Sequence, residues 1–438
     1  MNRGFCRTLY VSAVAALLAG CGRPELPTSI PGGGGSATTI SSTSPRGDRY
    51  KVLYSFQGSP DGLGPGGLTL LNGTFYGTAG GGSCYEHGCG TVFKITPSGT
   101  ESVIYRFKGG SDGDDPVGQL VSLNGTLYGV TNAGGNNSGP CAPPESGCGT
   151  VFKISTTGDE HVLYRFKGGK DGDYPLAGLT SLNGQLYGTT DHGGGYYGRG
   201  TVFQITVTGK EKVLYRFQGG ASDGEEPQAP LVALNGTLYG TTAYGGCTYC
   251  NSRGTVFFVS TSGGERMMYS FQGADNGGDG AIPEAGLIAI NNVLYGTTSL
   301  GGYNGSRSCG RSFDLGGCGT VFSLTLGGKK QVLHRFKAIA DGADPASALV
   351  EAKGKLYGTT ASGGSGGTGS GGYGTVFQVT LTGKERVIHR FRGAPDGANP
   401  FSGLTYLGAK LYATTISGGD ACDQFSPAGC GTVFAISP

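Results

Sequence analysis

The residues of this chain that could do chemistry are mostly carboxylates at fixed spacing. An Asp-Gly-x-x-Pro segment recurs, beginning at Asp61, Asp112, Asp171, Asp223, Asp279, Asp341 and Asp396. Oxygen ligands of this kind could hold calcium or another hard cation, or act as acid and base. However, Asp-Gly before Pro is also common turn chemistry, and a residue repeated in every unit usually serves the unit. We therefore favour a structural role and expect no cofactor, with calcium as the alternative.

Loop residues that break the repeating pattern are better candidates for contacting a ligand. They are His192, Tyr196, Tyr197, Arg199, Tyr244, Tyr249, Tyr303, Arg307 and Arg311. Tyr and Arg among glycines could form a face that binds a sugar or a peptide, although unspecialised loops would look the same. The sequence offers no unique carboxylate pair and no His-Asp-Ser arrangement, so we assign no catalytic residue.

The cysteines indicate disulfides. After Cys6 and Cys21, ten cysteines fall into five local pairs: Cys84 with Cys89, Cys141 with Cys148, Cys247 with Cys250, Cys309 with Cys318, and Cys422 with Cys430. Zinc is the rival interpretation, but the spacing varies and no His accompanies the pairs, so we expect no metal site. Cys247-Thr-Tyr-Cys250 also matches a redox motif but lacks the strand-to-helix setting of one.

These residues are positioned by a tandem repeat. Gly-Thr-Val-Phe occurs seven times, at intervals of 51 to 65 residues. Each unit supplies four strand-like runs, which we call A to D; in the third unit they are 178–182, 185–190, 200–206 and 212–217. Asn-Gly turns at Asn72, Asn124, Asn183 and Asn235 join A to B in four units, and short Gly turns join C to D. A period of this length with four strands per unit predicts an all-β, seven-bladed β-propeller.

The ends of the repeat region are out of phase. The segment 50–56 resembles a D strand, whereas the last unit stops after its C strand. An unpaired edge would be exposed there, so we predict that 50–56 pairs with 431–437 and closes the ring. Alternating strand direction then places the B–C loops and the D–A connections on one face, which we call the loop face.

The N-terminus predicts export. Arg3 and Arg7 precede a short apolar run that ends in Leu-Ala-Gly-Cys21, which resembles a bacterial lipobox. We expect a signal peptide at 1–20, lipidation of Cys21, a flexible linker at 21–49 and the propeller at 50–438. An ordinary signal peptide is the alternative. Gly22 after the Cys favours an outer-membrane or surface location over retention at the inner membrane.

The net charge and the distribution of basic residues limit the kinds of partner that we expect. The formal net charge is +2, and Lys and Arg form no basic stripe of the kind that nucleic acid requires. We expect no nucleic acid partner, a membrane contact only through the lipid, and a monomer.

The repeat, with its Leu-Asn-Gly-x-Leu-Tyr-Gly-Thr-Thr, Gly-Thr-Val-Phe and Val-Leu-Tyr-x-Phe segments, resembles the GloVer tandem-repeat family of bacterial exported proteins. The resemblance covers 50–438. It implies export and surface anchoring, and it carries over no catalytic residues.

Two functions follow from these observations. We expect a non-enzymatic binding module for an extracellular glycan, peptide or protein that contacts its ligand through the loop face. The alternative is a polysaccharide hydrolase or lyase with carboxylates as acid and base.

Overall fold

The computed structural model describes residues 49–59, 61–81, 88–141, 147–195, 198–247, 253–273, 278–302, 309, 316–364, 371–420, 422 and 428–438. The expected signal peptide, Cys21 and nearly all of the linker lie outside these residues. The unit Asp48–Pro438 is compact and is described below.

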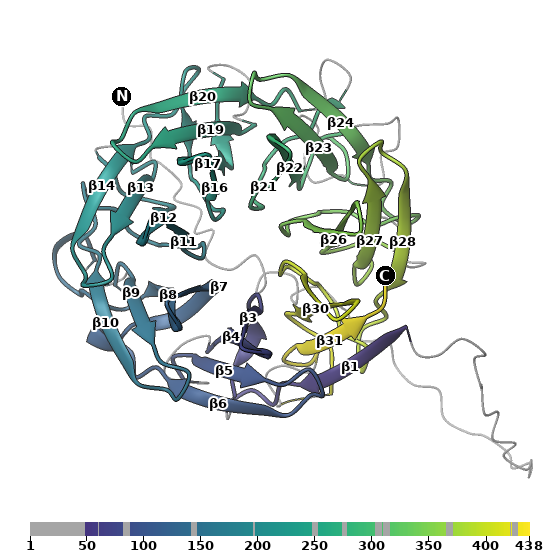
Figure 1. Ribbon diagram of the computed structural model, residues 1–438, viewed down its shortest axis with the longest axis horizontal. Coiled ribbons are helices and arrows are strands. Elements are labelled where there is room, and N and C mark those ends of the chain that lie inside the picture. Colours follow the sequence, from purple (N-terminus) through teal and green to yellow (C-terminus); the bar gives the residue numbers. More distant parts are fainter. Residues whose placement is uncertain are drawn as a thin grey trace, which may run out of the picture. The chain divides into compact units, whose positions relative to one another are not determined.

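Seven antiparallel sheets are arranged as blades around a ring; six have four strands, and the first has a fifth, short strand, β2 (Leu63–Pro65), paired with β4 (Thr74–Gly80) (Figure 1). The inner A strands are β3 (Thr69–Leu71), β7 (Asp114–Leu123), β11 (Thr180–Leu182), β16 (Val232–Leu234), β21 (Ile288–Ile290), β25 (Val350–Ala352) and β29 (Thr405–Leu407). The B strands are β4 (Thr74–Gly80), β8 (Thr126–Ala133), β12 (Gln185–Thr190), β17 (Thr237–Thr242), β22 (Val293–Thr298), β26 (Lys355–Thr360) and β30 (Lys410–Thr415).

The C strands are β5 (Thr91–Ile95), β9 (Thr150–Ile154), β13 (Thr201–Ile205), β19 (Thr255–Ser260), β23 (Thr320–Thr325), β27 (Thr375–Thr380) and β31 (Thr432–Ile436). The outer D strands of blades 1 to 7 are β6 (Glu101–Arg106), β10 (Glu160–Arg165), β14 (Glu211–Arg216), β20 (Glu265–Ser270), β24 (Lys330–Arg335), β28 (Glu385–Arg390) and β1 (Tyr50–Ser55). The short strands β2 (Leu63–Pro65), β15 (Gly224–Glu225) and β18 (Tyr244–Gly245) and the 3-10 helices η1 (Gly110–Asp112) and η2 (Gly139–Cys141) lie outside this pattern. The predicted all-β, seven-bladed propeller is confirmed.

The Asn-Gly turns have the backbone that the sequence predicts. Asn183 has a φ of 51° and Gly184 a φ of 73°. Both central residues of a type I′ hairpin turn need positive φ, which Asn tolerates and Gly adopts freely. The turn fixes the register of β11 against β12, in which Leu182 faces Gln185.

Phenylalanines form the core between blades. The Phe of each Gly-Thr-Val-Phe segment packs edge-on against the Phe that follows the D strand of the preceding blade, as Phe203 does against Phe166 at a centroid distance of 5.1 Å. Both rings are fully buried. Gly188 of Leu-Tyr-Gly lies directly over Phe203, and a Cβ there would come within 2.6 Å of the ring. The repeated Gly and Phe are therefore explained by packing.

The N-terminal strand supplies the outer strand of blade 7. β1 pairs antiparallel with β31, from Tyr50 opposite Ile436 to Ser55 opposite Thr432, and the two lie side by side in Figure 1. The Phe56 backbone N–H donates to the Gly431 carbonyl at 3.0 Å. Blade 7 also contacts blade 1, because the Thr414 hydroxyl donates to the Pro65 carbonyl at 2.9 Å.

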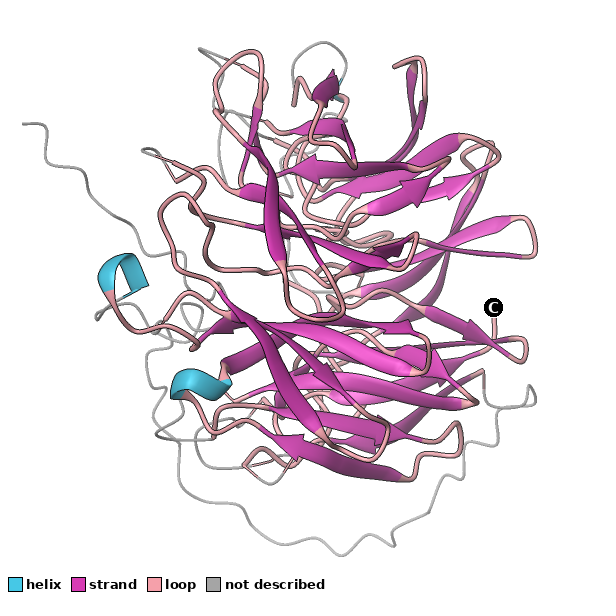
Figure 2. Cartoon of the chain, turned by 60° about the vertical axis from the view of Figure 1, so that its left-hand side comes forward, coloured by secondary structure: helices cyan, strands magenta, loops and turns pink. Residues whose placement is uncertain are grey.

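The strand directions divide the connections between two faces. Because successive strands of every blade are antiparallel, the A–B and C–D turns lie at one end and the B–C loops and D–A connections at the other. η1 belongs to a D–A connection and η2 to a B–C loop, and Figure 2 shows the helical turns on one side of the strands. The B–C loops and the D–A connections thus begin and end on the same face of the ring.

Candidate functional site

The repeated Asp carboxylates are bound by the protein itself. In the connection from blade 2 to blade 3, the Tyr164 hydroxyl donates to Asp171 at 2.8 Å, and the Lys167 backbone N–H donates to the other carboxylate oxygen at 2.8 Å. The equivalent Asp accepts the same backbone bond in every connection. His334 and His389 replace the Tyr in blades 5 and 6 and contact the Asp through Nε2. These contacts favour the structural interpretation over a calcium site.

Most of these Asp side chains also face a glutamate from the next blade. We call each junction between adjacent D strands a seam. The first residue of the next D strand is Glu101, Glu160, Glu211, Glu265 or Glu385 in five seams. Burial raises the pKa of the first four to about 7, and the charge of the facing Asp adds to this effect. In all five, Oε1 is buried and has no hydrogen-bond partner among the described residues.

The loop face of blades 3 and 4 carries a different cluster, which begins at the end of β12. Asp191 is buried, with 6% of its side chain exposed, and its carboxylate lies 2.7 Å from Nδ1 of the half-exposed His192. The hydrogen bond to Asp191 raises the pKa of His192 to about 9, against the opposing effect of burial. The imidazole is therefore a cation at neutral pH, held at the surface by a buried carboxylate.

Four more residues lie at this cluster. Arg199, which ends the B–C loop of blade 3, forms an ion pair with Glu225 of the next connection. β15 pairs with β18, which places Glu225 opposite Tyr244. Burial, followed by the Asp191 charge, raises the pKa of Glu226 to about 7, while His192 and Arg199 oppose that rise. The structure thus brings His192 and Arg199 together around Glu226, and it places Tyr244 opposite Glu225 in the adjoining strand pair.

The remaining predicted ligand-contacting residues lie outside the described residues. They are Tyr196, Tyr197, Tyr249, Tyr303, Arg307 and Arg311. What sequence reasoning missed is that Asp191, Glu225 and Glu226 surround His192 and Arg199. The available signal was the repeat phase, because Glu225 and Glu226 occupy the two variable positions of the fourth Asp-Gly-x-x-Pro segment.

The disulfides lie on the same face, where they cross-link individual B–C loops. Cys141 is bonded to Cys148, Cys309 to Cys318, and Cys422 to Cys430, each pair within one B–C loop. Cys89 and Cys247 are also disulfide-bonded, whereas Cys84 and Cys250 lie outside the described residues. Disulfides persist in oxidising compartments, which indicates an extracytoplasmic protein. Among the described residues, no helix is both long enough and apolar enough to cross a bilayer.

The fold and the loop face together identify the class of protein. It is a seven-bladed β-propeller whose ring carries variable loops that disulfides cross-link. The chain belongs to the Gloeobacter/Verrucomicrobia repeat family, whose sequence profile matches residues 27–196, 141–313 and 195–434. No curated protein sequence matches the chain.

Solved structures share the architecture at low identity. They include the PQQ-bound aldose sugar dehydrogenase of Streptomyces coelicolor, which is 11% identical with a TM-score of 0.41 and covers 88% of this chain and 97% of its own. A gluconolactonase of Xanthomonas campestris is 12% identical with a TM-score of 0.40 and covers 89% of each chain. The endosialidase of phage phi92 is 10% identical with a TM-score of 0.46 and covers 88% of this chain and 68% of its own. These similarities concern the fold alone.

Proposed function

We propose that the protein is a lipid-anchored, extracytoplasmic binding module that contacts a glycan, peptide or protein through its loop face. The observation that supports this most is the cluster at blades 3 and 4. There, His192 and Arg199 of the B–C loop of blade 3 and Tyr244 of the B–C loop of blade 4 depart from the repeat. His192 pairs with Asp191, Arg199 pairs with Glu225, and Tyr244 lies opposite Glu225 in the strand pair. A rigid scaffold that presents variable loops is a common basis of binding surfaces.

The charge of this cluster limits the chemical class of ligand that it would bind. Asp173, Asp191, Glu225 and Glu226 outnumber the cationic His192 and Arg199. An acidic surface with an exposed imidazolium favours a ligand rich in hydroxyl or amino groups over a polyanion. Carboxylates, Tyr and Arg are the side chains that hydrogen-bond and stack on sugars and peptides.

Anchoring would hold the propeller at a membrane on the extracytoplasmic side. Lipidation at Cys21 would hold the chain at the outer membrane or cell surface, and two or more acyl chains give stable attachment. Residues 22–49, rich in Gly, Ser, Thr and Pro, would let the ring move roughly 30 Å from the membrane.

A second candidate is a polysaccharide hydrolase or lyase. It is favoured by the His192–Asp191 pair and by Glu226, whose pKa of about 7 leaves it half protonated at neutral pH. Such a group can donate and accept a proton at working pH. The expected products are shortened oligosaccharides, whose release would be abolished by Glu226→Gln.

The proposal is tested by screening fragment 48–438 against glycan and protein arrays, followed by measuring the affinity of the best hit. We expect His192→Ala with Arg199→Ala to weaken binding by about tenfold or more, as for central contact residues. The matched control is Lys210→Ala with Lys384→Ala, two exposed residues in C–D turns on the opposite face. Equal loss in both double variants, or no loss in the first, would rule out this face as the binding surface.

A further inference from the structure

The seam between blades 5 and 6 differs from four of the other seams in one side chain. Four seams combine Tyr, Asp and Glu, as at Tyr164, Asp171 and Glu211. At this seam, His334 of β24 takes the Tyr position, whereas Asp341 and Glu385 of β28 are retained. The phenol of these seams donates its proton to the Asp carboxylate, whereas a neutral imidazole can donate an N–H or, once that nitrogen is deprotonated, offer a lone pair to a metal ion.

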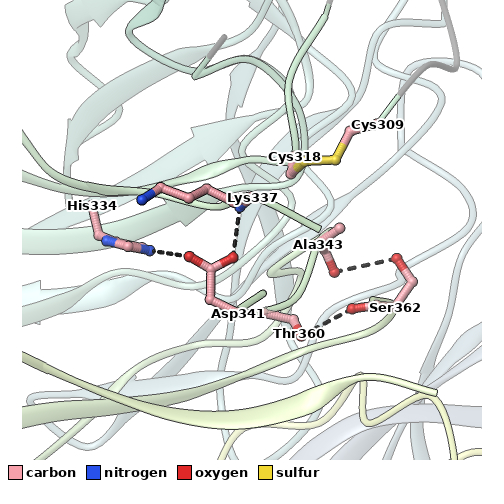
Figure 3. Close-up of a disulfide and its surroundings, with 8 residues drawn as sticks. All are labelled: Cys309, Cys318, His334, Lys337, Asp341, Ala343, Thr360 and Ser362. Atoms are coloured by element: carbon pink, nitrogen blue, oxygen red, sulfur yellow. Dashed lines mark hydrogen bonds and ion pairs between the residues drawn. A yellow bond between two sulfur atoms is a disulfide. The ribbon is translucent and has the colours of Figure 1, made fainter. Parts of the chain in front are cut away.

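The three side chains converge on one point. Nε2 of His334 lies 2.9 Å from Oδ2 of Asp341, and Figure 3 shows the imidazole directed at this carboxylate. The Lys337 backbone N–H holds the other oxygen of Asp341 at 2.6 Å. One ligand atom from each of His334, Asp341 and Glu385 lies within 4.8 Å of the others. Ligand atoms around tetrahedral zinc are about 3.4 Å apart, given bonds of about 2.1 Å.

The surroundings suit an ion rather than a solvated cluster. The side chains of His334 and Asp341 are 14% and 8% exposed. Oε1 of Glu385 is buried and has no hydrogen-bond partner among the described residues. The His334 ring packs edge-on against Phe336 at 4.9 Å, which fixes its orientation. Imidazole and carboxylate ligands in a partly buried setting suit zinc and neighbouring first-row divalent ions.

We propose that His334, Asp341 and Glu385 bind one such divalent metal ion, which joins blades 5 and 6 at the outer rim. The proposal differs from the sequence-based expectation of no metal site, and it is independent of the loop face. The ion would replace the proton shared between His334 and Asp341 and would give the unpartnered Glu385 oxygen a ligand bond.

Another seam of the ring provides a control for this metal site. At the seam between blades 6 and 7, His389 contacts Asp396. There, Tyr50 takes the place of the Glu and stacks on the imidazole at 3.8 Å. That seam offers two of the three ligands. His389 is therefore a matched histidine that should not support binding of the same affinity.

The test is titration of untagged, EDTA-dialysed protein with Co²⁺ and Zn²⁺, followed by cobalt absorption and by melting temperature. We expect one saturable site per chain, a higher melting temperature with Zn²⁺, and at least tenfold weaker binding in His334→Tyr and Glu385→Gln. His389→Tyr should bind as the unmodified protein does. Since His334→Tyr restores the residue used in other blades, it should fold normally, and its metal-free melting temperature checks this.

Tyr164→His gives a second, constructive test, because it would complete the same ligand set with Asp171 and Glu211. The expected stoichiometry is two ions per chain. Undiminished binding by His334→Tyr, equal loss in His389→Tyr, or the absence of a saturable site in the unmodified protein would overturn the proposal.

Discussion

Deleting residues 49–57 is expected to abolish cooperative folding of the whole propeller. The deletion removes β1, leaves β31 with an unpaired edge and takes away Phe56, which is fully buried between blades 7 and 1. The loss of one such Phe alone costs about 3–5 kcal/mol. Since natural domains are stable by only about 5–15 kcal/mol, loss of the entire strand exceeds what the ring can tolerate. Calorimetry of fragments starting at Asp48 and at Gly58 measures the effect.

A single substitution gives the graded version of this experiment. Phe56→Ala should destabilise the protein by about 3–5 kcal/mol, and Phe166→Ala, at the same position of blade 2, should do so to a similar extent. Equal losses of stability would mean that the seam closed by β1 contributes as much to stability as a seam within the chain. The closed-ring account fails if the fragment starting at Gly58 melts like the longer one, or if Phe56→Ala has little effect.

Stability is expected to fall as the pH rises from about 4.5 to 7. The seam glutamates Glu101, Glu160, Glu211 and Glu265 have pKa values of about 7 in the folded protein. An unfolded Glu has a pKa of about 4.3. In this window the folded state binds more protons than the unfolded state, so unfolding becomes easier with rising pH, and the effect levels off above the folded pKa. With allowance for partial exposure, each glutamate contributes about 1 kcal/mol.

Chemical denaturation between pH 4.5 and 8 tests this expectation. Replacing the four glutamates by Gln should reduce the slope, and Glu160→Gln alone should produce about a quarter of that reduction, since linked protons add across distant sites. A matched control is Glu351→Gln, an exposed glutamate outside the seams. Stability that rises with pH through this window, or an unchanged slope in the fourfold variant, would show that the seam carboxyls are not the cause.

The architecture was predictable because its determinants are local and repeated. Asn-Gly pairs dictate the hairpins, and the Gly and Phe of each unit dictate the packing between blades. The role of the repeated Asp was also accessible, because Asp-Gly before Pro already indicates a turn. Gly-Thr-Val-Phe occurs seven times and Asn-Gly joins A to B in four units, which left little freedom for another fold.

The sites were less predictable because they combine residues from neighbouring repeats. Tyr105 and Glu160 meet at one seam although they stand at different phases of successive units. Glu226 approaches Asp191 and His192 only after blades 3 and 4 pack together. For the same reason, the sequence alone shows His334 only as a replacement for the repeated Tyr. Its place in a three-residue cluster becomes visible only when the fold brings Glu385 beside it. Contacts across blades have no fixed spacing in the chain.

Closure of the ring depends on the pairing of the first strand with the last, and closure brings the loop connections of blades 7 and 1 side by side. The most direct measurement is a disulfide between Lys51→Cys and Ala435→Cys, which face each other across β1 and β31. Peptide mapping of the oxidised protein should identify this cross-link in nearly every molecule, with the melting temperature retained or raised. Recovery of the two cysteines as free thiols, or joined to other strands, would contradict the closed ring and the placement of the loop face.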